Sequence, residues 1–349
     1  MTEFELRFSV QIRPRMKVLF IGGAGNISAD CAALLHERGH EIFLLTRGRA
    51  KVPPGYTAIV ADRKDAAAMR AGLKGSQFDV AIDFLGYELA EVQQDHDLFN
   101  GMVRQYIFIS SATVYAKPPK QLPIREDAPL GNDAWDYARK KLECEEWLRR
   151  KAEETGFPVT IVRPSHTYSK AWVPNAVSSG SYTFTARLEQ GKPVYVHDDG
   201  ETLWTLTATS DFAVGLAGLV GNDKAVGEAF HVTSDEALTW NQIYLEIADA
   251  LGAKNPEIVK IPTDFICEMA PEMSGNLKGD KAHSGVFDNS KIKHFVPDFG
   301  CRKPFRVGVR ESIACLREHP ELQNRKPELD ATIERIIASW RGRQTTRMA

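Results

Sequence analysis

The stretch "KVLFIGGAGNIS", residues 17–28, joins a short apolar run to a glycine-rich loop and then to a helical pattern. Gly22 and Gly25 fit the first two glycines of a GxxGxxG motif, and Ser28 stands where the third is expected. Glycines let the backbone turn sharply and approach a pyrophosphate, which free N–H groups at the start of the next helix bind. The alternative is a plain strand–helix turn. We expect a dinucleotide to be bound by Gly22, Ala24, Gly25, Asn26 and Ile27.

The first half of the chain alternates short apolar runs with helical patterns, and this alternation predicts βαβ units. Because the runs are almost entirely apolar, the strands should form a parallel sheet that is covered on both faces. We therefore predict an α/β fold with a Rossmann-type doubly wound parallel sheet. The predicted strands cover residues 17–22, 41–46, 57–61, 78–84, 105–110 and 159–164.

The second half has a different pattern, with turns and short strands over residues 178–206 and a charged, helical tail from about residue 304. Two helical patterns lie between them, at 209–221 and 239–252. We expect three parts that share a cleft between the second and third. They are an N-terminal extension (1–15), the dinucleotide-binding Rossmann domain (16–175) and a smaller α+β domain (176–349) that mainly binds the substrate.

The composition is that of a soluble globular protein, with 43% hydrophobic and 26% charged residues and a formal net charge of −2. It provides no basic field for nucleic acid, and no apolar run approaches the ~20 residues that span a bilayer. Scattered cysteines without a CxxC pair, and an N-terminus without a secretory pattern, favour a reduced, cytoplasmic setting. We expect no metal site, no nucleic acid and no membrane contact.

The end of the second predicted strand distinguishes NAD from NADP. An acid there would hold both ribose hydroxyls of NAD, but this chain has Thr46 followed by Arg47. The missing negative charge and the nearby guanidinium favour the 2′-phosphate of NADP, and a solvated basic loop is the alternative. After the third strand, Asp62 is a candidate for the adenine amino group or an exposed turn residue. Arg63 beside it is a further candidate for cofactor binding.

Two segments carry candidate catalytic groups. In "IFISSATVYA", residues 107–116, an apolar run ends in paired serines, and in "WDYARKKLE", residues 135–143, Tyr137 and Lys141 share one helix face. A lysine ammonium near a phenol lowers a pKa that is otherwise about 10. Tyr137 would then act as an acid and base near neutral pH. The alternatives are a tyrosine that packs in the core and Lys140 as the partner.

The order of "GGAGNIS", "SSATVY", "YARKK" and "VRPSHTY" resembles the extended short-chain dehydrogenase/reductases, the NAD-dependent epimerase/dehydratase family. The resemblance implies that Ser111 hydrogen-bonds the reacting hydroxyl, that Tyr137 transfers the proton, and that Lys141 holds the nicotinamide ribose. It also implies that the chain forms a homodimer. Further residues that the resemblance places at the cofactor are Leu85, Gly86, Pro164 and His166, and the last of these also borders the substrate.

The residues after Ser111 bear on the reaction. Ala112 and Thr113, which we also expect at the substrate, lack the acid pair that dehydratases of this family use there. "SATVY" instead resembles the UDP-glucose/galactose 4-epimerases, whose chemistry is hydride removal, rotation of the keto intermediate and hydride return. A departure from them is Trp204, which takes the place of an arginine that binds the diphosphate. It would stack on a sugar or belong to the core. Candidates to replace the lost charge are Lys278, His283 and Lys291.

These observations predict an NAD(P)-dependent, epimerase-like oxidoreductase that acts on a sugar or nucleotide sugar. The first alternative is an NADP(H)-dependent reductase or dehydrogenase of a carbonyl or alcohol without a nucleotide. The second is a relative that binds a cofactor or RNA without catalysis. The intact set of Ser111, Tyr137 and Lys141 favours an enzyme.

Overall fold

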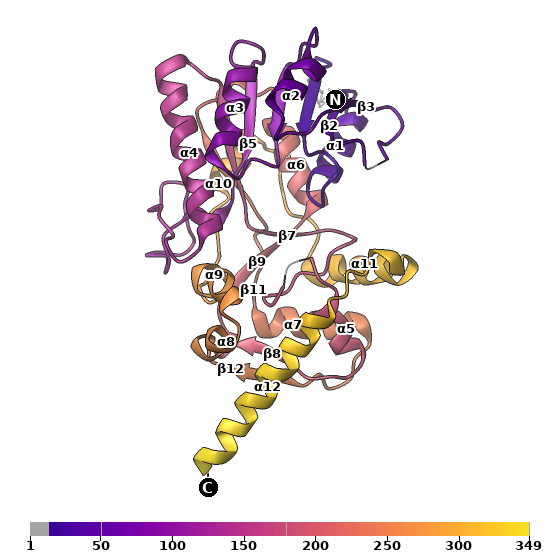
Figure 1. Ribbon diagram of the computed structural model, residues 1–349, viewed down its shortest axis with the longest axis vertical. Helices are drawn as coiled ribbons and strands as arrows, with labels where there is room; N and C mark the ends of the chain where they lie inside the picture. Colours follow the sequence, from indigo (N-terminus) through magenta and orange to yellow (C-terminus); the bar gives the residue numbers. More distant parts are fainter. Residues whose placement is uncertain (1–13, 50, 179, 349) are drawn as a thin grey trace, which may run out of the picture.

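The computed structural model of the chain describes residues 14–49, 51–178 and 180–348. Most of the predicted N-terminal extension therefore lies outside the described residues. A large sheet with flanking helices forms one end of the molecule, and smaller sheets with helices form the other (Figure 1). Within the described residues, no helix is both long enough and apolar enough to cross a membrane.

The large sheet has seven parallel strands in the order β10-β6-β5-β4-β1-β2-β3. The chain moves outward from β1 in one direction and then crosses back to build the other half, which is the doubly wound arrangement. The predicted fold class is confirmed, and the six predicted strands all form within two residues of their expected ends. The strands are β1 (Lys17–Ile21), β2 (Glu41–Thr46), β3 (Thr57–Val60), β4 (Val80–Asp83), β5 (Gln105–Ile109), β6 (Val159–Pro164) and β10 (Ala229–Val232).

Helices cover both faces of this sheet, because its strands present apolar side chains on both sides. One face packs against α1, α6 and α10, and the other packs against α2, α3 and α4. The two layers bury the strands almost completely, so only the strand ends are available for chemistry. The helices are α1 (Ser28–Glu37), α6 (Thr209–Leu219), α10 (Ser290–Phe295), α2 (Ala66–Leu73), α3 (Leu89–Phe99) and α4 (Asp136–Thr155).

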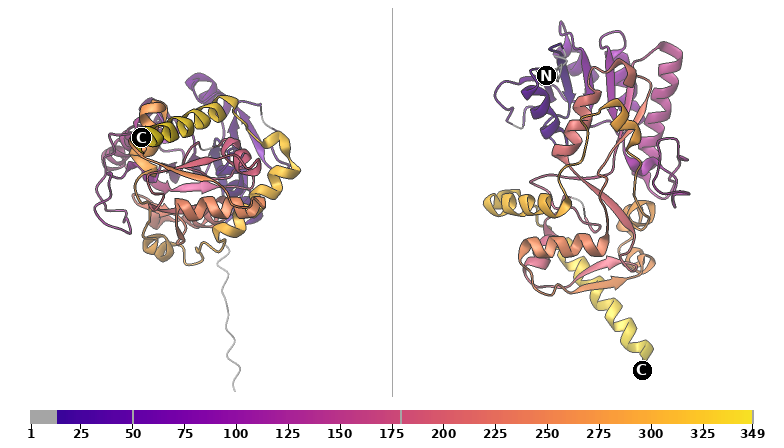
Figure 2. Two further views of the ribbon diagram at one scale, coloured as in Figure 1. Left: turned by 90° about the horizontal axis from the view of Figure 1, so that it is seen from below. Right: turned by 180° about the vertical axis from the view of Figure 1, so that it is seen from behind.

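The smaller part contains a three-stranded sheet, β11-β9-β7, and the strand pair β12-β8. Its core is separate from the two layers of the large sheet, and Figure 2 shows helix α12 extending away from it toward the C-terminus. The strands are β7 (His166–Tyr168), β8 (Val194–His197), β9 (Leu203–Ala208), β11 (Ala237–Thr239) and β12 (Ile258–Ile261). The helices are α5 (Thr183–Glu189), α7 (Trp240–Leu251), α8 (Thr263–Met269), α9 (Ser274–Asn276), α11 (Phe305–Glu318) and α12 (Pro327–Met348).

The chain passes between the two parts more than once. Strand β10 and helices α6 and α10 follow the predicted boundary at residue 175, yet they complete the large sheet and its helical layer. Residues 176–349 therefore supply both the smaller part and one edge of the larger one. The boundary did not anticipate this return because β10 is short and lies between turn-rich segments.

A buried ion pair fixes helix α4 against strand β6. The Arg163 guanidinium donates to the Glu145 carboxylate through Nε at 3.0 Å and Nη2 at 2.6 Å, and neither side chain is more than 1% exposed. Its Nη1 donates to the hydroxyl of Tyr115 at 2.7 Å. Since α4 carries Tyr137 and Lys141 at its start, this pair sets the position of the candidate catalytic groups relative to the sheet.

Replacement of Glu145 by alanine should strongly destabilise the fold, because it leaves the buried Arg163 charge uncompensated. We expect a loss of about 3–5 kcal/mol in the free energy of unfolding, measured by urea denaturation. Glu146→Ala is the matched control, since Glu146 is the exposed neighbour on the same helix. A Glu145→Ala variant as stable as this control would contradict the role given to the pair.

Candidate functional site

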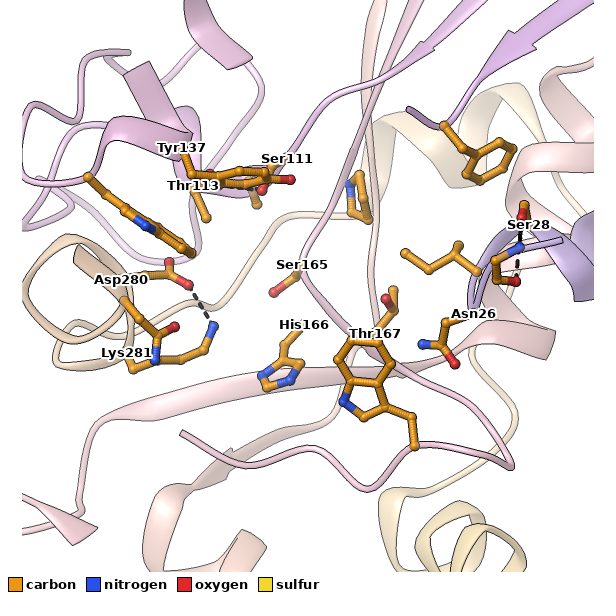
Figure 3. A pocket seen from close by; sticks show the side chains of 18 of the residues that line it. Asn26, Ser28, Ser111, Thr113, Tyr137, Ser165, His166, Thr167, Asp280 and Lys281 are labelled. Atoms are coloured by element: carbon orange, nitrogen blue, oxygen red, sulfur yellow. Dashed lines mark hydrogen bonds and ion pairs between the residues drawn. The ribbon is translucent and has the colours of Figure 1, made fainter. Parts of the chain in front are cut away.

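A cavity of about 510 Å³ lies between the two parts of the molecule. The glycine-rich loop after β1 forms one end of it, and Asp280 and Lys281 form the other, with Ser111 and Tyr137 between them on one side and His166 on the opposite side (Figure 3). The carboxyl ends of β5 and β6 open into this space. This is the crevice where doubly wound sheets bind their ligands.

Ser28 explains why the loop works without its third glycine. The Ser28 hydroxyl donates to the carbonyl of Gly22 at 2.8 Å and accepts from the N–H of Gly25 at 2.9 Å. The serine therefore closes the turn with its side chain and begins helix α1 at the same residue. Gly22 adopts a φ of +90°, and a Cβ there would lie 2.5 Å from the Leu85 side chain. The loop thus depends on a glycine at this position.

The loop residues predicted to bind a dinucleotide line two neighbouring cavities. Gly22, Gly25, Asn26 and Ile27 line the first, and Ala24 joins Gly22 and Gly25 in lining the second, which has a volume of about 530 Å³. The second cavity also contains Arg47, Asp62 and Arg63 from the ends of β2 and β3. Leu85 lines both cavities. A dinucleotide has this shape, with one half on each side of a pyrophosphate.

The cationic side chains in the second cavity are suited to bind a phosphate group. Arg47 and Lys51 supply cationic side chains, and both are exposed. Asp62 is exposed, and its Oδ1 accepts from the backbone N–H of Lys64 at 3.0 Å, which leaves the second carboxylate oxygen free to accept from a ligand.

Arg63 is bound by acidic residues within the protein. Its guanidinium donates to Asp83 at 2.5 and 2.9 Å and to Asp95 at 3.0 Å, and the side chain is only 6% exposed. The Asp83 carboxylate neutralises this guanidinium, so Arg63 shapes the cavity wall and offers no free charge. Burial raises the pKa of Asp95 to about 8, whereas Arg63 holds the pKa of Asp83 below its usual value against the effect of burial.

Asp83 organises the segment after β4, and the sequence interpretation missed it. Its Oδ1 accepts the backbone N–H groups of Leu85 and Gly86, both at 2.8 Å. Gly86 packs so closely on Asp83 and Phe108 that a Cβ would collide with both. The carboxylate therefore holds the backbone of this segment beside the first cavity. A single acid within an apolar strand does not by itself indicate this role. A charged group at the end of a buried strand is nevertheless unusual, because a buried charge requires a partner.

Ser111 and Tyr137 face each other across the upper wall of the first cavity (Figure 3). The Ser111 hydroxyl accepts from the backbone N–H of Thr113 at 3.2 Å and from its hydroxyl at 2.9 Å. The Tyr137 ring stacks on Tyr87, with 5.6 Å between the ring centroids. Ala112 also lines the cavity. Strand β5 and helix α4 thus bring together two residues that are distant in the sequence.

The pKa of Tyr137 moves in the opposite direction to the sequence prediction. Burial raises it to about 12, and a hydrogen bond with Ser111 only partly offsets this. Lys141 does not approach the phenol as a charge partner, because its ammonium donates to the carbonyls of Gly86 at 2.6 Å and Ile109 at 2.7 Å. Burial lowers the pKa of Lys141 to about 8, although Asp83 opposes the shift. Lys140 lies outside, paired with Glu88 at 2.6 Å.

The same cavity is lined by Pro164, which the sequence placed at the cofactor, and by His166 and Trp204, which it placed at the substrate, together with two residues that were not predicted. Trp204 is 2% exposed and belongs both to the core and to the cavity wall. The unpredicted residues are Asp280 and Lys281. None of the three earlier candidates for the missing charge lines this cavity, since Lys278 pairs with Asp264, Lys291 pairs with Glu228 and His283 is bonded to a backbone carbonyl.

Among the described residues, no group of three or more His, Cys, Asp and Glu side chains is placed to hold a metal ion. The reactive side chains of the cavity are therefore a phenol, hydroxyls, an imidazole and one ion pair. Together with two adjoining cavities along a glycine-rich loop, they define a dinucleotide-binding fold whose candidate acid–base group is a tyrosine.

Residues 18–232 match the NAD dependent epimerase/dehydratase family, and the chain belongs to this family. Among curated proteins, a chloroplast stem-loop binding protein of 41 kDa from Arabidopsis thaliana is 30% identical over 71% of this chain and 67% of its own length. A 2′-dehydrokanamycin reductase from Streptomyces kanamyceticus is 26% identical over 81% of this chain and 80% of its own. The resemblance seen in the sequence is confirmed.

Solved structures agree on the fold. A UDP-glucose 4-epimerase from Thermotoga maritima superposes with a TM-score of 0.71 at 18% identity, over 87% of this chain and 99% of that one. An epimerase from Methanothermobacter thermautotrophicus gives a TM-score of 0.75 at 16% identity, over 88% of this chain and 94% of that one. The doubly wound sheet and the smaller C-terminal part are therefore those of epimerase-type short-chain dehydrogenase/reductases.

The phenol of Tyr137 should remain protonated in the free protein until strongly alkaline pH, because burial disfavours the phenolate. The measurement is the phenolate absorbance of the native chain during a pH titration, minus that of Tyr137→Phe. We expect the difference to develop only near the pKa of about 12. In the unfolded chain the same difference should appear near a pKa of about 10. A phenolate signal from Tyr137 near neutral pH in the folded protein would show that its environment is not the one described.

Proposed function

We propose that the chain is an NAD(P)-dependent oxidoreductase that transfers a hydride reversibly to and from a carbon of a sugar or nucleotide sugar, in the manner of an epimerase. The observation that carries this proposal is the meeting of Ser111 and Tyr137 in the same cavity as the glycine-rich loop. Family membership supports it, and so do curated relatives named as an epimerase and as a reductase. The predicted homodimer and cytoplasmic setting stay predictions.

We assign roles in this reaction to five of the lining residues. Gly25 and Asn26 would hold the pyrophosphate side of the cofactor, and Arg47 would contact the adenosine ribose. The dinucleotide supplies the hydride acceptor and donor when it is bound. Ser111 orients the reacting hydroxyl by a hydrogen bond, and Tyr137 takes its proton as the C–H bond is broken or returns it when the bond re-forms.

Lys141 acts on this step by position. Its ammonium lies between the carbonyls of Gly86 and Ile109. With a pKa of about 8, it keeps a positive charge at neutral pH close to the ends of β5 and of the segment after β4. We infer that it positions the segments that hold the nicotinamide ribose.

A net reductase of a sugar carbonyl is the second candidate, and two observations favour it. Tyr137 is held in its protonated form, which is the form that donates a proton to a carbonyl oxygen during reduction. Strand β2 ends at Thr46, and Arg47 follows it, so no acid stands at the position that would bind the ribose hydroxyls of NAD. This favours NADP. A relative that covers most of the chain is named 2′-dehydrokanamycin reductase. Several similar solved structures instead hold NAD, among them a UDP-glucose 4-epimerase from Thermus thermophilus.

Tyr137→Phe should remove turnover and preserve cofactor affinity, because the ring remains while the acid–base oxygen is lost. General acid–base catalysis contributes about 10²–10⁴-fold, so kcat should fall by that factor on a responsive sugar substrate. The assay follows substrate conversion together with nicotinamide absorbance. An epimerase converts its substrate without net absorbance change, whereas a reductase consumes one nicotinamide per turnover.

Lys140→Met provides the control for this measurement, since Lys140 lies on the same helix and pairs with Glu88 outside the cavity. It should leave kcat within a factor of about 3. Full activity of Tyr137→Phe would contradict the proposed chemistry. Salt-sensitive RNA binding, with no turnover of any sugar by the parent chain, would instead favour the binding-protein alternative.

Arg47→Ala should weaken NADP binding and leave NAD binding unchanged, because only NADP offers the 2′-phosphate. Loss of one charge-assisted hydrogen bond costs about 1.5–3 kcal/mol, which is roughly 10- to 100-fold in Kd. Titration calorimetry with both cofactors gives the two values. Arg49→Ala is the matched control, because Arg49 is exposed on the same loop and does not line the cavity. An equal loss of affinity for NAD and NADP would show that Arg47 does not contact the 2′-phosphate.

A further inference from the structure

The substrate end of the cavity is built on an unusual turn. Residues Leu277–Lys281 form a π-helix, and the N–H of Ala282 donates to the carbonyl of Leu277 at 2.9 Å. Single π-turns occur often at functional sites, since they project side chains that an α-helix would turn away. Here the turn presents Asp280 and Lys281 to the cavity.

The backbone of Lys281 is held independently of its side chain. Its carbonyl oxygen accepts from the indole Nε1 of Trp204 and of Trp240, each at 3.2 Å, and from His197 Nε2 at 2.9 Å. These donors come from β9, α7 and β8, which are separate elements of the smaller part. Three ring N–H groups on one carbonyl fix the turn, so the ammonium group is directed into the cavity and is not needed to hold the fold.

The charged groups at this end form a compact cluster of buried side chains. Lys281 Nζ lies 2.6 Å from Asp280 Oδ2 and 4.1 Å from the centroid of the Trp204 ring. Lys117 Nζ approaches the other carboxylate oxygen of Asp280 at 3.4 Å. All three side chains are at least nine-tenths buried. Two ammonium groups therefore share one carboxylate, and the cluster carries a net positive charge.

His166 offers a second, independent sign of a ligand on the facing wall. Its side chain is 9% exposed, and neither ring nitrogen has a hydrogen-bond partner within the part of the chain that the structure describes. Burial and the nearby Lys281 lower its pKa well below the usual value, so the ring is neutral. A neutral imidazole has one donor and one acceptor. The His166 ring lines the same cavity as the Lys281–Asp280 pair (Figure 3).

We propose that Lys281, Asp280 and His166 form a subsite for adjacent hydroxyls of an uncharged sugar ring that carries no nucleotide diphosphate. This inference rests on the proposed function and names the substrate class of the same site. Lys281 donates to one sugar oxygen, Asp280 accepts from the neighbouring hydroxyl, and His166 completes the set from across the cavity.

The chemistry of the lining excludes two other ligand classes. None of the described residues that line this cavity is an arginine, so the two-pronged contact that a guanidinium makes with phosphate is absent. The ammonium groups of Lys117 and Lys281 are already paired with Asp280. An ammonium group on the sugar would meet the net positive charge of Lys117 and Lys281 without a free carboxylate to receive it. A neutral diol satisfies both members of the ion pair without such repulsion.

The test is ligand binding to the full chain, followed by tryptophan fluorescence and confirmed by titration calorimetry, with and without NADP. The probes are a panel of neutral methyl hexopyranosides, a 2-amino hexoside and UDP-glucose. We expect at least one neutral hexoside to bind more tightly than both other probes. Lys281→Met should weaken that binding by about 10- to 100-fold, the effect of losing one charge-assisted hydrogen bond. Lys278→Met, three residues away on the exposed face, should leave it unchanged.

Lys281→Met should fold, because Lys117 still pairs with Asp280 and the three ring N–H groups still hold the backbone. Asp280→Asn provides a second variant of the same shape and should also weaken hexoside binding. Tighter binding of UDP-glucose, equal affinity in parent and Lys281→Met, or no hexoside binding at all would each overturn the inference. Hexoside binding that depends on Lys281 but leads to no hydride transfer would overturn the proposed function and leave this subsite standing.

Discussion

The buried ammonium group of Lys141 connects the three segments that make the site. It donates to the carbonyl of Gly86 after β4 and to that of Ile109 at the end of β5, and it is carried by α4. Burial of a charge is costly, and the pKa of Lys141 falls to about 8 for this reason. The nearby carboxylate of Asp83 offsets part of the cost. It is the buried polar anchor of α4 near the point where Tyr137 enters the cavity, and the more exposed Lys140–Glu88 pair lies beside it.

Asp83 extends the same network to the adenosine side. It receives two backbone N–H groups of the segment that Lys141 also holds, and it binds Arg63 at the edge of the second cavity. One carboxylate is therefore shared by the supports of both cavities. Removal of Asp83 would leave the buried Arg63 guanidinium without its bidentate partner and the Lys141 ammonium without its nearest opposing charge. The two halves of the cofactor region are thus positioned as a unit.

The sequence predicted what depends on local pattern. The strands of the large sheet, the loop from Gly22 to Ser28 and the helix with Tyr137 all have their signals within a few residues. The prediction failed for residues whose partners are close in space but distant in the sequence. Asp83 resembles an interruption of an apolar strand, and Asp280 and Lys281 resemble a solvated turn. Their partners, such as Trp204 and Lys117, lie more than 75 residues away, so only the folded chain brings them together.

The protonation states bear on the direction of the reaction. Burial keeps Tyr137 protonated and gives Lys141 a pKa near neutrality, so both groups resist charge in the same desolvated wall. A protonated phenol is ready to donate a proton, which is the step that completes carbonyl reduction. Removal of a proton from a hydroxyl requires the phenolate, and the free chain stabilises that form only through Ser111. An epimerase needs both steps in each turnover, whereas a reductase needs one. The oxidising step of an epimerase would therefore require a further positive charge beside Tyr137 during the reaction.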